Sequence, residues 1–316
     1  MKSRFLKLGL VLLLTAVMLA ACAPTPATTT TPPSPPSPVT ITDQAGRAVT
    51  FASAPQRIIS LAPGDTEILF ALGLGDRVVA VTDYCDYPPE VKSKPSIGGY
   101  STPSIEAIVS LSPDLIVADS IHKAAVVPQL EGQGLKVIIL DANSIDEVLA
   151  AIAMVGKACG VRENAANLIN GMEARIKAVT DKTAGLSQEQ RPSTCYLVWH
   201  DPLMVAGLGT LQDELIDKAG GRNLIRALSS QRGYGTISLE TLIAANPAVL
   251  MTGTGHGDDT DLTIQYARTE PRLSGTDARK NNRVYGLDAN ITSRPGPRIV
   301  DALEAFAHYL HPELFP

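Results

Sequence analysis

Hydrophobic positions in the first half of the chain follow two alternating patterns. Short continuous apolar runs, which are typical of buried strands, lie at 57–62, 77–81, 114–118 and 136–140. Between these runs, apolar side chains recur at helical spacing, as Ile105, Ile108 and Val109 do in the segment SIEAIVSL. Ser104 is the predicted N-cap of that helix, and Pro113 ends it. Strands that alternate with helices predict parallel βαβ units.

Two other helices of this half carry less regular signals. In PGDTEILFALGLG, Asp65 or Thr66 can cap the start, and Gly73 and Gly75 can end the helix. The helix before the last apolar run contains Pro128, which predicts a break.

The alternation returns after a long helical region at 144–184, which Gly160 interrupts. Further strands are predicted at 194–199, 248–252 and 283–287. Thr210 and Ser238 are the predicted N-caps of two more helices. The chain closes with the helix of PGPRIVDALEAFAHYL, whose prolines suit a first turn and which is expected to contain Arg298.

One short unit occurs twice in the sequence. The segments PSIEAIVSLSPDLIVA (103–118) and ISLETLIAANPAVLMT (237–252) each begin with a Ser-capped helix and continue, after a proline, into a core strand. Glu106 of the first copy aligns with Glu240 of the second. The repeat predicts an α/β fold with two similar lobes, each with a central, mostly parallel sheet, joined by one long backbone helix.

The predicted boundaries follow from this pattern. They give an N-terminal αβ lobe at 39–143, a helical connection with the backbone helix at 144–184 and a C-terminal αβ lobe at 185–316. Ligands of open parallel sheets bind beyond the carboxyl ends of the strands. Two such lobes that face each other form a cleft, so the sequence predicts ligand binding between them.

The N-terminus has the pattern of an export signal. Three basic residues precede an apolar run at 8–21, which is short for a membrane span. The run ends in LAAC, which resembles a bacterial lipobox, so a signal peptide at 1–21 and lipidation at Cys22 are predicted; an ordinary signal peptide is the alternative. Segment 22–38, rich in Pro and Thr, is a predicted tether. We therefore expect a protein anchored by lipid at the extracytoplasmic face of the cell membrane.

Charge and cysteine usage exclude some classes of protein. The formal net charge of −5 gives no support for nucleic-acid binding, which needs a basic face. The 4 cysteines have no CxxC spacing, so structural zinc is not predicted. Besides Cys22, the cysteines Cys85, Cys159 and Cys195 are interpreted as buried thiols. A disulfide, for example between Cys159 and Cys195, stays open at this point.

From about residue 40 to residue 312, the sequence resembles class III substrate-binding proteins of ABC importers, in which a single helix connects two lobes. The resemblance lies in RIISLAPGDTEILFALGLGDRVVAVTDYCDYPPEVK, GGYSTPSIEAIVSLSPDLIVA, GRNLI and SRPGPRIVDAL. The family serves cobalamin, haem and ferric siderophores, and DYCDYPPEVK is most similar to the cobalamin-binding branch. The resemblance implies a monomeric binding protein, not an enzyme, that delivers a corrinoid to an ABC permease dimer with its ATPase subunits.

The resemblance also implies a role for the repeated glutamates. In the family, one glutamate on each lobe docks into arginines of the two permease subunits, which carries over to Glu106 and Glu240. Both acids are expected in the first turn of a helix, on the side away from its apolar stripe. Stabilisation of the helix dipole, about 0.3–1 kcal/mol each, is the alternative interpretation. It does not explain the same acid in both copies of the repeat.

Aromatic residues make up 4% of the chain, so their positions are informative. Four of them fall in predicted loops or at strand ends: Tyr84, Tyr100, Trp199 and Tyr234. Aromatic rings stack on flat macrocycles, and by resemblance these positions line the corrinoid pocket. Arg294 matches an arginine near the ligand and can bond amide oxygens or a phosphate. Asn290 stands where the cobalamin-binding branch has an acid that contacts the ligand.

Other ligands stay open within the same fold. Asp119 stands where the cobalamin-binding branch has an aromatic residue. Haem could be coordinated by a tyrosine or by His200. A ferric siderophore is anionic and favours several Arg or Lys in the cleft, of which Arg294 is the one expected.

A metal-dependent enzyme is the lower alternative. The segment GTGHGDDTD brings His256 close in sequence to Asp258, Asp259 and Asp261. A loop of Gly and Asp is more typical of a solvated turn, and the sequence has no GxSxG, P-loop or HExxH motif. We therefore predict neither a metal site nor a resident cofactor.

Overall fold

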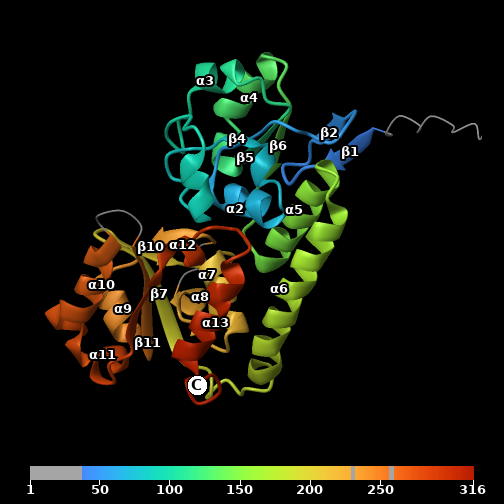
Figure 1. The fold of residues 1–316 in the computed structure, drawn as a ribbon. Coiled ribbons are helices and arrows are strands. Elements are labelled where there is room, and N and C mark those ends of the chain that lie inside the picture. The colour runs from blue at the N-terminus through green and yellow to red at the C-terminus, as the bar shows by residue number, and fades with distance from the viewer. Residues whose placement is uncertain (1–37, 229–231, 256–259) are drawn as a thin grey trace, which may run out of the picture. The chain divides into compact units, whose positions relative to one another are not determined.

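The computed structural model describes residues 38–228, 232–255 and 260–316 (Figure 1). The predicted signal peptide, the lipidation site and nearly all of the tether lie outside the described residues. Within those ranges, no helix combines the length and the apolar character that a membrane span requires.

Four parallel strands form the sheet of the N-terminal lobe, in the order β4-β3-β5-β6. They are β3 (Ile58–Ser60), β4 (Val78–Ala80), β5 (Leu115–Asp119) and β6 (Val137–Leu140). Each strand overlaps a predicted apolar run, and most of its side chains are buried. Strands of a parallel sheet are buried on both faces, which is why they appear as continuous rather than alternating apolar runs.

Helices and a hairpin surround this sheet. The helices are α2 (Pro63–Ala71), η1 (Gly75–Arg77), η2 (Pro89–Ser93), α3 (Ile105–Ser110), η3 (Ser120–His122) and α4 (Val126–Gly132). The antiparallel hairpin consists of β1 (Val39–Thr42) and β2 (Ala48–Phe51) and was not predicted.

Two local predictions about this lobe are wrong. The helix α2 begins at Pro63, and no side chain caps it, so Asp65 and Thr66 lie inside its first turn. Proline fits the first helical position because its φ is already suitable and its missing N–H is not needed there. For the same reason Pro128 lies in the first turn of α4 without breaking it.

The sheet of the C-terminal lobe is mixed. Its order is β10-β8-β7-β11-β12, and β9 also pairs with β7. The pairings of β7 with β9 and β11, and of β11 with β12, are parallel, whereas β8 is antiparallel to both neighbours. The strands are β7 (Ser193–His200), β8 (Leu203–Ala206), β9 (Arg222–Asn223), β10 (Tyr234–Thr236), β11 (Val249–Thr254) and β12 (Val284–Asp288).

The helices of this lobe include several that were not predicted. They are α7 (Leu211–Lys218), α8 (Ile225–Leu228), α9 (Leu239–Ala245), α10 (Thr260–Thr269), η4 (Pro271–Gly275), α11 (Asp277–Lys280), α12 (Ala289–Thr292) and α13 (Ile299–Leu310). The side chains of Thr210 and Ser238 cap α7 and α9 as predicted. Arg298, expected inside the last helix, is instead its N-cap residue, because Pro295 and Pro297 lie in the preceding loop.

One long helix, α6 (Arg162–Thr183), connects the lobes after α5 (Ile145–Ala158) (Figure 1). Gly160 separates these two helices at a φ of 73°, a conformation that favours glycine. The prediction of an α/β fold with two lobes and one backbone helix is confirmed.

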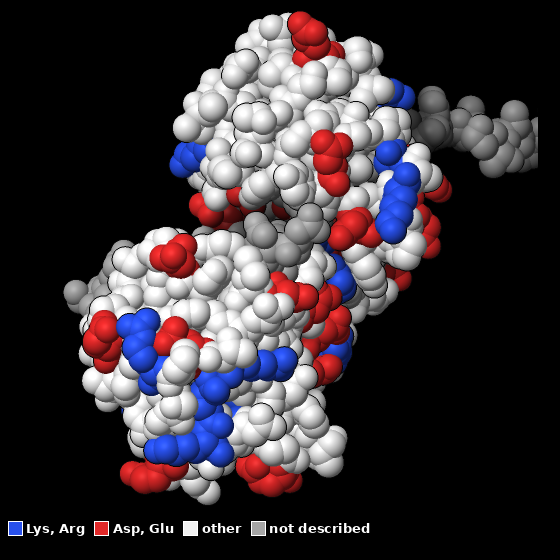
Figure 2. Space-filling view, turned by 90° about the vertical axis from the view of Figure 1, so that its left-hand side faces the viewer, with Lys and Arg blue, Asp and Glu red and all other residues white. Residues whose placement is uncertain are grey.

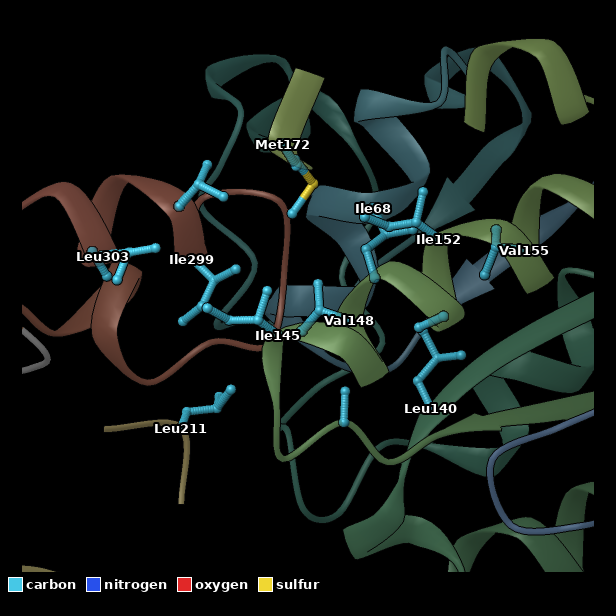
Figure 3. Close-up of a cluster of buried hydrophobic side chains, with 14 of the residues drawn as sticks. Ile68, Leu140, Ile145, Val148, Ile152, Val155, Met172, Leu211, Ile299 and Leu303 are labelled. Atoms are coloured by element: carbon cyan, nitrogen blue, oxygen red, sulfur yellow. The ribbon is translucent and has the colours of Figure 1, made fainter. Parts of the chain in front are cut away.

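The largest hydrophobic cluster extends through both lobes (Figure 3). It joins Ile68 of α2 and Ile152 of α5 to Met172 of α6, and continues to Leu211 of α7 and Leu303 of α13. The helices α2 and α13 therefore pack into one shared core.

Three cysteines lie in the described ranges. Cys85, Cys159 and Cys195 are buried and unbridged, which confirms the interpretation as buried thiols. Burial raises the pKa of Cys159 and of Cys195 to about 12, so both stay protonated at neutral pH.

Charged side chains of both signs form groups on the face shown in Figure 2, most of which consists of other residues. Asp and Glu gather around its middle, and Lys and Arg gather mainly over its lower part. Exposed charges of both signs favour solubility.

Candidate functional site

A cavity of about 400 Å³ lies between the two lobes. The N-terminal lobe contributes Ala62–Asp65 at the start of α2, Tyr84, Tyr100–Ser101, and Asp119 at the end of β5. The C-terminal lobe contributes Ser293–Pro295 from the loop before α13. The cavity thus lies beyond the carboxyl ends of β3 and β5, where parallel sheets bind ligands.

Three of the six predicted ligand-binding residues line this cavity: Tyr84, Tyr100 and Arg294. The Tyr84 side chain is 58% exposed, so its ring is available to a ligand, whereas Arg294 is buried. Tyr100 is half-buried, and its backbone carbonyl accepts a hydrogen bond from Nε2 of His122 at 2.7 Å. His122 can donate there because its Nδ1 accepts from the backbone N–H of Asp119.

The other three predicted residues do not line the cavity. Trp199 lies in β7, and its Nε1 donates to the carbonyl of Asp201 at 2.7 Å. Tyr234 begins β10, and its hydroxyl donates to Oε1 of Gln212 at 3.0 Å. Asn290 lies half-buried in α12.

His200, a candidate haem ligand, does not line the cavity, unlike the candidate ligands Tyr84 and Tyr100. The ring of His200 lies 4.8 Å from Trp199 and 5.8 Å from Tyr266, between centroids. His256, Asp258 and Asp259 lie outside the described residues, and Asp261 lies in α10. Across the described ranges, no three His, Cys, Asp or Glu side chains are placed to hold a metal ion.

A cluster of charged side chains joins the lobes beside the cavity. Arg298 donates to both carboxylate oxygens of Glu67, at 2.9 and 2.6 Å. Arg294 contacts Asp86 at 2.5 Å and Glu67 at 3.4 Å. The guanidinium of Arg298 also lies 3.9 Å from the ring centroid of Tyr87. Two arginines of the C-terminal lobe are therefore paired with two acids of the N-terminal lobe.

These ion pairs reduce the positive charge that Arg294 can offer to a ligand. Burial opposes the charge of Asp86, but the hydrogen bond and the positive charge of Arg294 hold the pKa of that carboxyl below its ordinary value. Arg294 therefore faces an ionised partner, and its own charge is already balanced. The sequence prediction named Arg294 and missed Glu67, Asp86 and Arg298, because their pairing depends on contacts between segments far apart in the chain.

The loop before α13 lies directly on the start of α2. A Cβ atom on Gly64 would come within 3.0 Å of the carbonyl oxygen of Pro295. A Cβ on Gly296 would lie 3.3 Å from both Glu67 and the Gly64 carbonyl. Glycine at these two positions allows the close approach of the lobes at the cavity wall.

Asp65 differs from every acid of that cluster. Its residue is 2% exposed, it lines the cavity, and its Oδ2 has no hydrogen-bond partner among the described residues. Burial, and then the negative charge of Asp119, raise the pKa of Asp65 well above its ordinary value. Burial and the negative charges of Asp119 and Asp65 also raise the pKa of Tyr100, so this phenol stays neutral. A sequence signal was present, since Asp65 is an acid three residues after a predicted buried strand, but it was interpreted as a cap.

The repeated glutamates lie on equivalent helices. Ser104 accepts a hydrogen bond from the third residue of α3, and Ser238 from that of α9, which confirms both predicted caps. Glu106 and Glu240 are exposed in the first turns of these helices. Glu240 also lies 3.5 Å from Arg272, in a pair whose side chains are 73% and 60% exposed.

The chain belongs to the periplasmic binding protein family, whose model matches residues 58–291. An uncharacterized ABC transporter substrate-binding lipoprotein of Bacillus subtilis, YvrC, is 33% identical over 315 residues, which cover 96% of each chain. A cobalamin-binding protein of Halobacterium salinarum is 29% identical over 279 residues, which cover 87% of this chain and 74% of the relative.

Solved structures of binding proteins have the same fold. The vitamin B12-binding protein BtuF of Vibrio cholerae has a TM-score of 0.69 at 27% identity, covering 81% of this chain and 96% of its own. The periplasmic heme-binding protein RhuT of Roseiflexus sp. RS-1 has a TM-score of 0.72 at 30% identity, and the match covers 83% of this chain and 99% of RhuT. The chain is therefore a substrate-binding protein of the ABC transporter type, a class of binding proteins rather than enzymes.

Proposed function

We propose that this protein captures a corrinoid, cobalamin, between its two lobes and delivers it to the permease of an ABC importer. The observation that carries the proposal is the cavity between the lobes, into which Tyr84 and Tyr100 bring aromatic surface. Rings of this kind stack on a flat macrocycle and hydrogen-bond at their polar tips. Relatives named as cobalamin-binding proteins support the choice of ligand.

The alternative ligand is haem. Similarity to a heme-binding protein supports it, and an exposed tyrosine such as Tyr84 can serve as an axial ligand. A ferric siderophore is less favoured, because Arg294 is already paired with acids and offers little free positive charge to an anion. Trp199, Tyr234 and Asn290 would contact a ligand only if it extends beyond the cavity.

Mutation of the cavity tyrosines tests the ligand assignment. Loss of the ring in Tyr84→Ala or Tyr100→Ala is expected to weaken cyanocobalamin binding about tenfold each, measured by titration calorimetry. Tyr84→Phe keeps the ring and is the matched control, with an expected change below about threefold. Unchanged affinity in both alanine variants would remove the tyrosines from the site.

We further propose that Glu106 and Glu240 dock the liganded protein onto the two permease subunits, as monomeric protein held near the transporter by lipid on Cys22. Both acids are exposed, and both occupy the same place in a repeated helix. Complementary charges of this kind steer and orient protein association.

Charge reversal separates docking from ligand binding. The double variant Glu106→Arg/Glu240→Arg is expected to abolish corrinoid uptake in cells while the affinity for cyanocobalamin stays unchanged. Glu163→Arg/Glu173→Arg, at exposed positions of α6, is the matched control and should keep uptake. Normal uptake by the first variant, or a loss of its ligand affinity, would contradict the docking role.

A further inference from the structure

Asp65 is a buried acid for which the fold supplies no partner. Its Oδ2 is fully enclosed and unbonded among the described residues, although the residue is 2% exposed and lines the cavity. Buried polar atoms of folded proteins are nearly always hydrogen-bonded, so an exception calls for an explanation. A group supplied by the ligand would satisfy this atom.

A second unpaired atom belongs to another residue that lines the same cavity. Nε of Arg294 is buried without a hydrogen-bond partner in the described part of the chain, while Nη1 of this residue is taken by Asp86 and Glu67. Asp65 comes from the N-terminal lobe and Arg294 from the C-terminal lobe. Two residues that line the cavity, one from each lobe, therefore have an unpaired acceptor and an unpaired donor atom among the described residues.

The other polar groups of the cavity have partners or carry no charge. Oδ1 of Asp119 accepts from the backbone N–H of Ile121 at 3.0 Å and caps η3. The charge of Arg294 is balanced by Asp86 and Glu67. Consequently no spare positive charge faces Asp65.

A primary carboxamide fits this arrangement. Its NH₂ can donate to Oδ2 of Asp65, and its carbonyl oxygen can accept from Nε of Arg294. A carboxylate at the same place has no hydrogen to donate and brings a second negative group to a buried acid.

We propose that Asp65 is a specificity-determining residue, which receives a neutral carboxamide of the ligand together with Nε of Arg294 and discriminates against a carboxylate. The inference rests on the proposed function, because the side chains of corrinoids end in primary carboxamides. Haem, in contrast, carries two propionate carboxylates.

Discrimination of this kind depends on pH. At low pH, Asp65 and a ligand carboxylate can share one proton, and at higher pH the two groups repel each other. The titratable and charged groups that face Asp65 are Asp119, Tyr100, Cys85 and Arg294. The pKa values of Tyr100 and Cys85 are raised by burial, so these two groups stay neutral over the range of the test.

The test compares cyanocobalamin with its b-, d- and e-monocarboxylates, in each of which one carboxamide is hydrolysed. The dissociation constants are measured at pH 6 and pH 8 with the full-length protein in detergent, for the wild type, Asp65→Asn and Asp76→Asn. Asp76 is exposed and does not line the cavity, so its variant is a control for the same change in charge.

We expect the wild type to bind at least one monocarboxylate at least tenfold more weakly than cyanocobalamin at pH 8, and less than threefold more weakly at pH 6. In Asp65→Asn, the ratio of the dissociation constant of this monocarboxylate to that of cyanocobalamin should fall below threefold at pH 8 and should no longer depend on pH. Asp76→Asn should keep the ratio and the pH dependence of the wild type.

Three results would overturn the inference. Equal binding of all four corrinoids by the wild type excludes discrimination, and an unchanged ratio in Asp65→Asn excludes Asp65 as its origin. Failure of cyanocobalamin itself to bind would remove the proposed function and the inference with it, and this result is distinct from the first two. If Asp65→Asn does not fold, a wild-type ratio of dissociation constants that is the same at pH 6 and pH 8 would still overturn the inference.

Discussion

Two buried aspartates occupy the same position in helices of the two lobes but have opposite surroundings. Asp65 is the third residue of α2, and Asp213 is the third residue of α7. Both residues are 2% exposed. Asp213 is surrounded by donors, whereas Oδ2 of Asp65 has none among the described residues.

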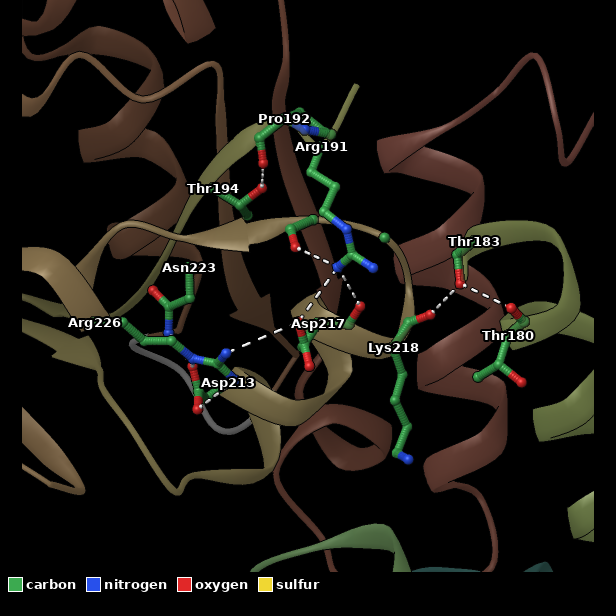
Figure 4. A network of polar contacts seen from close by, with 12 residues as sticks. Thr180, Thr183, Arg191, Pro192, Thr194, Asp213, Asp217, Lys218, Asn223 and Arg226 are labelled. Atoms are coloured by element: carbon green, nitrogen blue, oxygen red, sulfur yellow. Dashed lines mark hydrogen bonds and ion pairs between the residues drawn. The ribbon is translucent and has the colours of Figure 1, made fainter. Parts of the chain in front are cut away.

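The surroundings of Asp213 are those of a structural acid (Figure 4). Oδ1 accepts from Nδ2 of Asn223 at 2.8 Å and from Nε of Arg226 at 2.7 Å. Oδ2 accepts from Nη2 of Arg226 at 3.0 Å and from the backbone N–H of Gly209 at 3.1 Å. The comparison shows that the position in a helix does not decide the role of a buried acid; its partners do.

The largest expected effect on stability is at Asp213. Asp213→Ala leaves Arg226 and Asn223 without their acceptor and should lower the free energy of unfolding by about 2–4 kcal/mol, less than for a fully buried pair because Arg226 is partly exposed. Urea denaturation measures this change. Asp217→Ala, at a more exposed acid of the same helix, is the control and should cost less than about 1 kcal/mol. Equal losses in the two variants would contradict the structural role.

Glu67 allows a second comparison, between a paired acid and the unpaired Asp65 in the same helix. It lies two residues after Asp65 but is paired with Arg298 and Arg294. Glu67→Gln should lower the free energy of unfolding by about 2 kcal/mol, because the partly buried Arg298 loses its counter-charge and Arg294 keeps only that of Asp86. Thermal denaturation followed by circular dichroism measures the loss. A variant as stable as the wild type would show that this cluster does not hold the lobes together.

Replacement of Asp65 should have the opposite effect on the free energy of unfolding. Its pKa is raised in the folded state, so the folded protein binds more protons than the unfolded chain above pH 4, and stability falls as pH rises towards the folded pKa. Asp65→Asn removes this effect. Its free energy of unfolding should therefore exceed that of the wild type by an amount that grows between pH 4 and pH 8, on the order of 1 kcal/mol. A constant difference over this range would mean that Asp65 does not titrate abnormally.

Much of the fold could be predicted because its signals are local. Ser104, Thr210 and Ser238 cap helices through their own side chains, and buried strands appear as apolar runs. The strands β8 and β10 were missed because they are short and gain their stability by pairing with a neighbouring strand.

The site was less predictable than the fold. Tyr84, Tyr100 and Arg294 line one cavity, but the sequence could not show that Arg294 is paired with Asp86. That contact joins residues 208 positions apart, and only the folded chain brings them together. The lack of a partner for Asp65 is likewise a property of the three-dimensional surroundings.

The most direct test of the proposed function is a competition between ligands. The full-length protein in detergent is mixed with equal amounts of cyanocobalamin, haemin and a ferric hydroxamate, desalted and examined by visible absorbance. We expect retention of the corrinoid spectrum at about one equivalent per chain. Retention of haemin or the ferric hydroxamate in its place would contradict the corrinoid assignment while leaving the fold and family unchanged.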